Sequence, residues 1–148
     1  MKIEKDSFLL LDSGGQYLDG TTDVTRTFHF GDPTYFEKEA YTRVLMGSID
    51  LARGIFRAGT TDTRMDILAR SPLYEVGLNY RHGTGHGIGS YGLVHESPIQ
   101  ESKRFYPLTH QGIVIQVRVY KKEEHELKVG MFFSDEPGVY LENMFGVR

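Results

Sequence analysis

The alternation of hydrophobic and polar positions near the start of the chain predicts a β-hairpin. Residues 8–11 form an unbroken apolar run that ends at Asp12, as expected of a buried strand. A Gly- and Asp-rich reversal follows, and residues 22–28 then alternate with β-branched side chains, which is typical of a second strand. Each predicted strand therefore carries one aspartate, Asp12 in the first and Asp23 in the second.

The position of the turn decides whether these two aspartates meet. A reversal at residues 17–18 would place Asp12 directly opposite Asp23, within cross-strand contact distance. The Asp-Gly pair at residues 19–20 is the stronger turn signal, and it would pair Asp23 with Gln16 and leave Asp12 further along the same face. Both registers are compatible with the sequence.

Two carboxylates brought together at one end of a hairpin repel each other. A β-bulge at residues 14–15 would bring Asp12 and Asp23 closer even with the later turn. Such a pair needs a cation or a shared proton, so the hairpin is a candidate cation site. The alternative is a polar hairpin with solvated aspartates, because an isolated acidic residue at a strand end is usually a turn former.

A long amphipathic helix is predicted after the hairpin. Thr34 and Glu37 have the spacing of a capping box, which marks a helix N-terminus. Apolar residues then recur at three- and four-residue steps over residues 40–56. This period predicts a helix of about twenty residues with one apolar face, ending at Gly59.

A second, shorter helix is predicted to begin at Thr61 and Asp62, which are residue types that suit a helix N-terminus. Pro72 is expected to break or kink this helix, because proline lacks the backbone N–H that the helix interior requires. Gly77 is expected to end it.

The rest of the chain alternates loops and strands. Residues 81–92 hold two histidines and are too rich in glycine for a helix. Residues 113–120 are β-branched and apolar and predict a strand, residues 121–126 a charged turn, and residues 131–136 a last strand that ends in acidic residues. Strands, two helices and further strands together predict an α+β fold with mixed or antiparallel sheets.

Composition narrows the function classes. A chain of 148 residues predicts one domain, and a net charge of −3 gives no electrostatic case for binding nucleic acid or an anionic membrane. The absence of cysteine excludes a disulfide framework, a thiolate metal site and a cysteine nucleophile. The sequence shows no signal-peptide pattern and no apolar run of membrane-spanning length, so a cytoplasmic location is expected.

The candidate chemistry lies in carboxylates and imidazoles at the ends of apolar strands. They are Asp12, Asp23, Glu136, a histidine from residues 82–87, and His95. One histidine with several carboxylates suits Mn, Co, Zn or Fe, and an excess of carboxylates suits two bridged metals that activate a water. Histidines outside the ligand set would donate to an oxyanion or carry protons. A phosphate cradle is rejected, because the glycine-rich stretch lacks a G-x-x-x-x-G-K-[ST] motif.

Short motifs then identify a family. They are Asp12-Ser-Gly-Gly-Gln-Tyr, Gly20-Thr-Thr-Asp-Val-Thr-Arg-Thr, His82-Gly-Thr-Gly-His-Gly-Ile-Gly, Val94-His95-Glu96 and Asp135-Glu136-Pro-Gly. In this order they resemble the catalytic domain of aminopeptidase P, also called Xaa-Pro aminopeptidase, a dinuclear metallopeptidase of the pita-bread fold. The resemblance covers nearly all of the chain except residues 103–126. The motifs Thr-Thr-Asp-Val-Thr-Arg-Thr and His-Gly-Thr-Gly-His are more similar to those of the long cytosolic type of aminopeptidase P than to those of prolidase or methionine aminopeptidase.

The resemblance implies a role for each candidate residue. Asp12, Asp23, His86 and Glu136 fall on metal-ligand positions, and His82 and His95 fall on histidines that contact substrate and assist proton transfer. The implied cofactor is two divalent metal ions, manganese first, with zinc or cobalt as alternatives. The implied reaction is hydrolysis of the bond between an N-terminal residue and a following proline, with a peptide carrying proline at its second position as substrate.

Three departures from the family pattern set further expectations. The family's fifth ligand is a glutamate shortly after a Phe-Gly-(Ile/Val)-Arg motif, here residues 145–148, where the sequence stops, so at least one metal position is expected to be weakened. No histidine precedes Asp12, where the family has another active-site histidine, and the family's N-terminal domains are not matched. Residues 103–126 are expected to be an insertion, and their strand at 113–120 presents an apolar edge that invites pairing.

These departures predict that residues 1–148 form an incomplete catalytic domain that self-associates as a homo-oligomer through exposed sheet edges. They also leave two alternatives to a peptidase that cleaves Xaa-Pro bonds. One is a non-catalytic pita-bread pseudo-enzyme or interaction module. The other is a prolidase-like enzyme acting on dipeptides.

Overall fold

The structure, a computed structural model, describes residues 2–101 and 124–148. Its elements, in chain order, are β1 (Phe8–Tyr17), β2 (Gly20–His29), α1 (Tyr35–Ala52), α2 (Asp62–Tyr74), β3 (Gly85–Ile88), β4 (His95–Glu101), β5 (Val139–Leu141) and β6 (Phe145–Val147). The strands form three antiparallel pairs, β1–β2, β3–β4 and β5–β6. Two helices and antiparallel strands confirm the predicted α+β class. The predicted strand at 113–120 lies outside the described residues.

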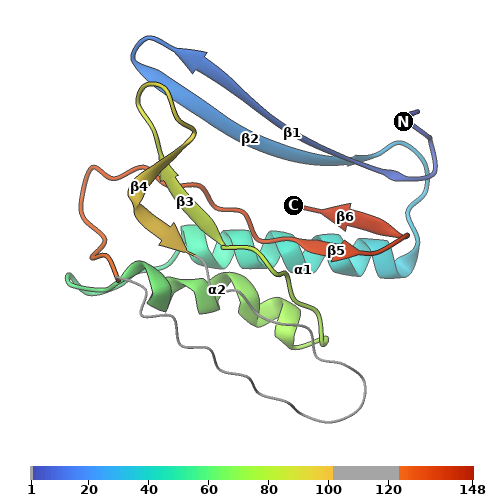
Figure 1. Cartoon of the computed structure of the whole chain (residues 1–148). Helices are drawn as coiled ribbons and strands as arrows, with labels where there is room; N and C mark the ends of the chain where they lie inside the picture. Colours follow the sequence, from blue (N-terminus) through green and yellow to red (C-terminus); the bar gives the residue numbers. More distant parts are fainter. Residues whose placement is uncertain (1, 102–123) are drawn as a thin grey trace.

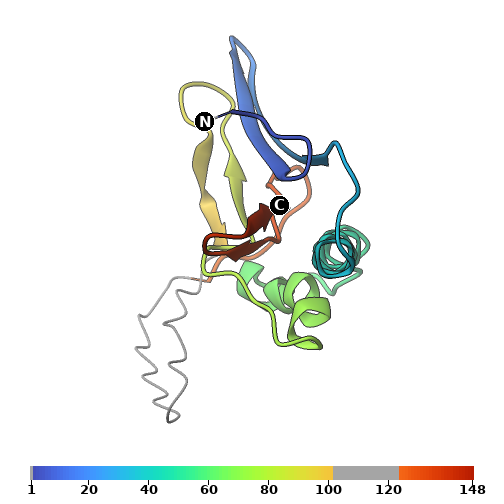
Figure 2. The ribbon, with the colours of Figure 1, turned by 90° about the vertical axis from the view of Figure 1, so that its right-hand side faces the viewer.

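The three hairpins lie on one side of the two helices (Figures 1 and 2). The short β5–β6 hairpin contacts both β1 and α1, and β3 contacts β2. The main hydrophobic cluster joins these elements through Val44 of α1, Leu73 of α2, Tyr80 of the loop after α2, and Val139 and Val147 of the last two strands. Among the described helices, neither is both long and apolar enough to cross a membrane.

The β1–β2 register differs from both registers expected from the sequence. Tyr17 pairs with Gly20, so the turn contains residues 18–19, and the pairing continues without a bulge. Asp12 therefore lies opposite Thr25, and Asp23 lies opposite Gly14. The two aspartates are diagonal neighbours on one face, a geometry in which side chains still reach a common region.

The helices begin where the sequence predicts. At Thr34 the capping box is complete, since the Thr34 hydroxyl accepts from the Glu37 N–H at 3.3 Å and the Glu37 carboxylate accepts from the Thr34 N–H at 2.7 Å. The predicted break at Pro72 is wrong, because α2 continues through this residue to Tyr74. The alternative, a kink at Pro72, stays a prediction.

Replacing Thr34 with alanine is expected to lower the free energy of unfolding by about 1 kcal/mol, because it removes one half of the capping box. The hydrogen bonds from the Thr34 hydroxyl and N–H lower the pKa of Glu37 below 4.5. A depressed carboxyl pKa adds stability above the unfolded value, and this contribution is lost as the pH falls through the folded value. Urea unfolding at pH 7 and pH 3 tests this, since the cost of Thr34→Ala should shrink at pH 3; an equal cost at both values would contradict it.

The segment at residues 131–136 pairs with β3, and within this segment Phe133 forms an isolated bridge with Gly87. Its backbone bonds are Ile88 N–H to Phe132 O at 3.1 Å, Ser134 N–H to His86 O at 2.9 Å and Glu136 N–H to Thr84 O at 2.7 Å. These bonds keep one antiparallel register. They therefore bring the acidic end of this segment beside the histidine-bearing strand.

Candidate metal centre

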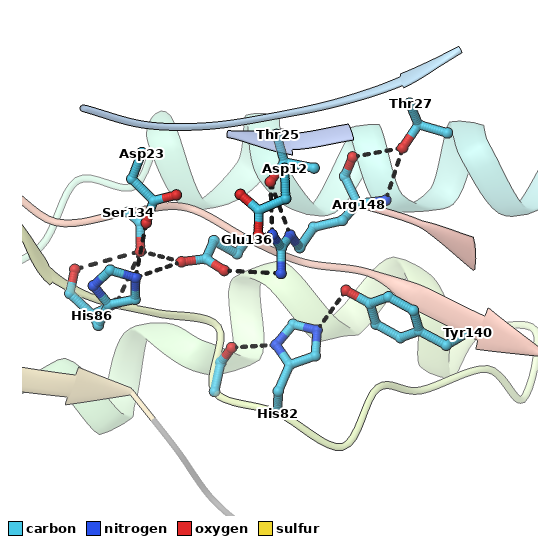
Figure 3. Close-up of polar contacts among 11 residues, drawn as sticks. Asp12, Asp23, Thr25, Thr27, His82, His86, Ser134, Glu136, Tyr140 and Arg148 are labelled. Atoms are coloured by element: carbon cyan, nitrogen blue, oxygen red, sulfur yellow. Dashed lines mark hydrogen bonds and ion pairs between the residues drawn. The ribbon is translucent and has the colours of Figure 1, made fainter. Parts of the chain in front are cut away.

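Three side chains from three separate segments each bring one ligand atom to the same point. Asp23 lies on β2, His86 on β3, and Glu136 on the segment that pairs with β3. His86 Nε2 lies 3.0 Å from Asp23 Oδ2 and 3.0 Å from Glu136 Oε1, and the three ligand atoms all lie within 4.8 Å of one another. Figure 3 shows the three side chains pointing toward one another.

The ring of His86 presents a lone pair to these carboxylates. Its Nδ1 lies 2.9 Å from the carbonyl oxygen of Gly87, and since a carbonyl only accepts, Nδ1 carries the proton. In the neutral ring Nε2 is then an acceptor. Within the described part of the chain this buried atom has no hydrogen-bond partner, although it lies 3.0 Å from an oxygen of each carboxylate.

A cation bound between the imidazole nitrogen and the two carboxylate oxygens would relieve the repulsion between the carboxylates. Ligands about 2.1 Å from one ion and at right angles to each other lie about 3.0 Å apart, which is the spacing seen around His86 Nε2. The donor set of one imidazole and two carboxylates suits a divalent transition metal. The residues present therefore fit a bound divalent metal ion.

Ser134 forms hydrogen bonds with both His86 and Glu136. Its hydroxyl oxygen accepts from the His86 N–H at 3.0 Å, and its hydroxyl donates to Glu136 Oε1. Ser134 is buried. It therefore fixes the carboxylate of Glu136 toward His86, as outer-sphere hydrogen bonds commonly do for metal ligands.

The fourth predicted ligand, Asp12, lies beside this point and contacts a cationic side chain. Arg148 forms an ion pair with Asp12, and its Nη1 lies 3.5 Å from Glu136 Oε2. Arg148 also donates to the Thr25 hydroxyl from Nε at 3.1 Å and from Nη2 at 2.7 Å. Glu136 thus directs one oxygen toward His86 and the other toward Arg148 (Figure 3). The role of Asp12 as a metal ligand stays a prediction.

His82 lies in the loop that precedes β3, four residues before His86, and takes a different position. Its Nδ1 lies 2.6 Å from Gly83 O, and its Nε2 lies 2.9 Å from the hydroxyl of Tyr140. Burial lowers the pKa of His82 below its usual 6.5, so the ring is neutral at pH 7. Since Nδ1 carries the proton toward Gly83, the Tyr140 hydroxyl donates to Nε2.

His95, the other predicted histidine, stacks on His86 at the mouth of the site. The two ring centroids are 3.6 Å apart, with an angle of 28° between the planes. A cavity of about 560 Å³ opens here, and the predicted site residues line it: Asp12, Asp23, His82, His86, His95 and Glu136. The structure therefore places every residue predicted from the sequence around one cavity.

Asp135, next to Glu136, points away from this cavity toward α1. The Ser48 hydroxyl donates to its Oδ2 at 3.1 Å. Burial raises the pKa of Asp135 to about 6, although the hydrogen bond from Ser48 acts in the opposite direction. The contact attaches the segment that carries Glu136 to the long helix.

Sequence reasoning missed three residues of the site: Ser134, Tyr140 and Arg148. Ser134 could have been found, because residues two apart on a strand share a face and Ser134 precedes Glu136 by two. Tyr140 gave no local signal, and Arg148 was noted only as the end of the Phe-Gly-Val-Arg motif, because the role of each depends on contacts with residues far away in the sequence.

Comparison with known proteins shows the family to which this chain is similar. The profile of metallopeptidase family M24 matches residues 1–148. Xaa-Pro aminopeptidase 2 of Mus musculus is 48% identical over 147 residues, which is 99% of this chain and 19% of that protein. A probable Xaa-Pro aminopeptidase P of Tuber melanosporum is 49% identical over 146 residues, 99% of this chain and 21% of that protein. The chain thus spans about a fifth of the length of the curated relatives it matches.

Solved structures agree with the sequence comparison. The X-prolyl aminopeptidase of Caenorhabditis elegans, described as a cytosolic enzyme with a di-nuclear active site, superposes with a TM-score of 0.77 at 39% identity, over 95% of this chain and 20% of that one. Prolidase from Pyrococcus furiosus superposes with a TM-score of 0.77 at 28% identity, over 98% of this chain and 37% of that one. These likenesses confirm the predicted pita-bread fold. The chain belongs to metallopeptidase family M24.

Proposed function

We propose that this chain carries the metal centre of an Xaa-Pro aminopeptidase, which hydrolyses the bond between an N-terminal residue and a following proline. The observation that carries the proposal is the convergence of Asp23, His86 and Glu136 around the buried, unpartnered Nε2 of His86. The 47–49% identity to Xaa-Pro aminopeptidases supports the substrate class.

The side chains around the cavity divide the work of peptide hydrolysis. Asp23, His86 and Glu136 hold a divalent metal, which when bound lowers the pKa of a water and polarises the carbonyl that the water attacks. His95 lies at the open side of the cavity, where its ring meets an entering peptide and carries a proton. His82 is held neutral, and its Nε2 accepts from the Tyr140 hydroxyl, so it orients the Tyr140 side chain.

We further propose two metal ions per site, with manganese first and zinc or cobalt as alternatives. The support is the di-nuclear active site described for the C. elegans structure and the position of Asp12 beside Glu136 on the same cavity. Arg148 contacts both carboxylates and already neutralises charge there. The second ion is therefore expected to bind more weakly than the first.

A peptidase assay of the purified chain tests the proposed function. With manganese present, tripeptides of the form Xaa-Pro-Xaa are expected to be cleaved after the first residue, and a chelator should abolish the activity. Asp23→Asn should lower kcat/KM by at least about 100-fold, since it removes a charged ligand. Asp19→Asn, the same change at the exposed hairpin tip, is the matched control. Equal activity of both variants would contradict the proposal.

Prolidase-like cleavage of Xaa-Pro dipeptides is a second candidate, supported by the equal TM-score of 0.77 to the P. furiosus prolidase. The sequence identity is higher to the C. elegans aminopeptidase than to the prolidase, 39% against 28%, which favours an Xaa-Pro-Xaa tripeptide as the substrate. Comparing kcat/KM for a tripeptide and the matching dipeptide decides between them. A non-catalytic role as a binding module would show as metal binding without cleavage of either.

Two further proposals concern the protein in the cell. We propose a cytoplasmic location, supported by the cytosolic C. elegans relative. We also propose self-association, because the three two-stranded sheets leave strand edges without a partner among the described residues. Light scattering across a concentration series tests the second, and a constant monomer mass would contradict it.

A further inference from the structure

A fully buried arginine, Arg70, contacts the loop at residues 79–84, which carries His82 and leads into β3 with His86. Its side chain is 1% exposed, and it comes from α2. Arg70 Nη1 donates to Tyr80 O at 2.8 Å, and Nη2 donates to His82 O at 2.9 Å. Nη1 also donates to Asn79 Oδ1 at 2.9 Å. One guanidinium therefore binds several points along residues 79–82, an irregular stretch whose carbonyls have no regular strand partner.

A buried carboxylate and two hydroxyls extend this contact to the next residues of the loop. Arg70 Nε donates to Asp66 Oδ2 at 2.7 Å, and the Thr84 hydroxyl donates to the other oxygen of Asp66. The Tyr80 hydroxyl lies 2.6 Å from the Thr84 hydroxyl, and the Arg70 guanidinium lies 3.8 Å from the centre of the Tyr80 ring. Asp66 and Thr84 are themselves buried, so each group depends on the others for its hydrogen bonds.

The backbone of this loop leads directly to the metal ligands. Thr84 O accepts from the Glu136 N–H at 2.7 Å, and His86 follows Thr84 by two residues. His82, whose carbonyl Arg70 holds, presents its ring to Tyr140. A displacement of the loop at Arg70 would therefore change the position of His82, His86 and Glu136 relative to one another.

We propose that Arg70, together with Asp66 and Thr84, is a positioning residue that sets the His82–His86 loop at the geometry required to bind the metal. The inference rests on the proposed metal-dependent function and deepens it. A buried ion pair in a core is rarely the most stable solution, since hydrophobic residues of similar volume serve as well. Here the ion pair has a further role through the backbone carbonyls that Arg70 reaches. Lysine cannot replace it, because one ammonium cannot span these carbonyls as the planar fork of arginine does.

Cobalt(II) titration of the purified chain, followed by its visible absorption, tests this role. Arg70→Lys is expected to weaken cobalt binding by about 10- to 100-fold and to alter the absorption bands, because outer-sphere partners have effects of this size. Leu51→Ala is the matched control, since Leu51 is buried between the helices in a separate cluster. It should lose stability but keep the wild-type affinity and spectrum when measured well below its unfolding temperature. Wild-type affinity in Arg70→Lys would overturn the proposal.

A second pair of variants serves if Arg70→Lys does not fold. Thr84→Val removes the hydroxyl between Asp66 and Tyr80 with little change in shape, and Thr84→Ser keeps it. We expect at least about tenfold weaker cobalt binding for valine and near wild-type binding for serine. Equal affinity of both variants and the wild type would overturn the proposal. A wild-type chain that binds no cobalt would instead contradict the proposed function itself, so the two failures are distinguishable.

Discussion

Replacing His86 with alanine is expected to weaken manganese binding by at least about 100-fold, which corresponds to about 2.7 kcal/mol. His86 Nε2 is the atom that faces both carboxylates at 3.0 Å, so its loss leaves Asp23 and Glu136 as two repelling anions with no imidazole between them. Isothermal titration calorimetry of wild type and variant with manganese measures the effect.

The matched control for this variant is His29→Ala. His29 lies at the far end of β2, where its ring packs edge-on against Phe8, with the ring centroids 5.3 Å apart. Manganese affinity should be unchanged there, although some stability is lost with the packing. If His86→Ala and His29→Ala bind manganese equally well, the metal does not bind at the cluster described above.

Replacing Gly85 with alanine is expected to lower the free energy of unfolding by about 1–3 kcal/mol or more and to weaken metal binding as well. A Cβ at Gly85 would lie 1.9 Å from the carbonyl oxygen of Ser134, a contact with backbone that a side-chain rotation cannot relieve. The bonds on either side, Ser134 N–H to His86 O and Glu136 N–H to Thr84 O, would have to lengthen. Glu136 would then move away from His86.

Gly20→Ala provides the control for Gly85→Ala. Gly20 also lies on a strand of a hairpin, but no atom lies within 4 Å of the Cβ that alanine would add. Its substitution should change stability by no more than about 0.5 kcal/mol and leave metal affinity unchanged. Urea unfolding and manganese titration of both variants test the pair, and unchanged metal affinity in Gly85→Ala would show that the close strand approach does not position Glu136.

Sequence patterns predicted the elements of the fold better than their register. The capping box at Thr34 and Glu37 is a local signal, and it gave the start of α1 correctly. The sequence permits several positions for the β1–β2 turn. The turn found contains residues 18–19, so neither the predicted reversal at 17–18 nor the one at 19–20 is correct. The predicted break at Pro72 was wrong, since α2 includes this residue and ends two residues later.

The candidate site was predictable where its residues form motifs in the sequence. Asp23, His86 and Glu136 were all identified, and the structure brings them together. Their supporting groups were not identified, because Arg70 has an ordinary sequence context and the motif that ends at Arg148 gave no indication of its contacts. Their meaning comes only from the carbonyls and carboxylates that the fold places around them.

The most direct test of the central claim is anomalous X-ray scattering at the manganese edge from crystals of this chain grown with manganese. The account predicts a strong peak between Asp23 Oδ2, His86 Nε2 and Glu136 Oε1, and no such peak in crystals of Asp23→Asn. A wild-type crystal without a peak at this cluster, or with a peak that persists unchanged in the variant, would contradict it.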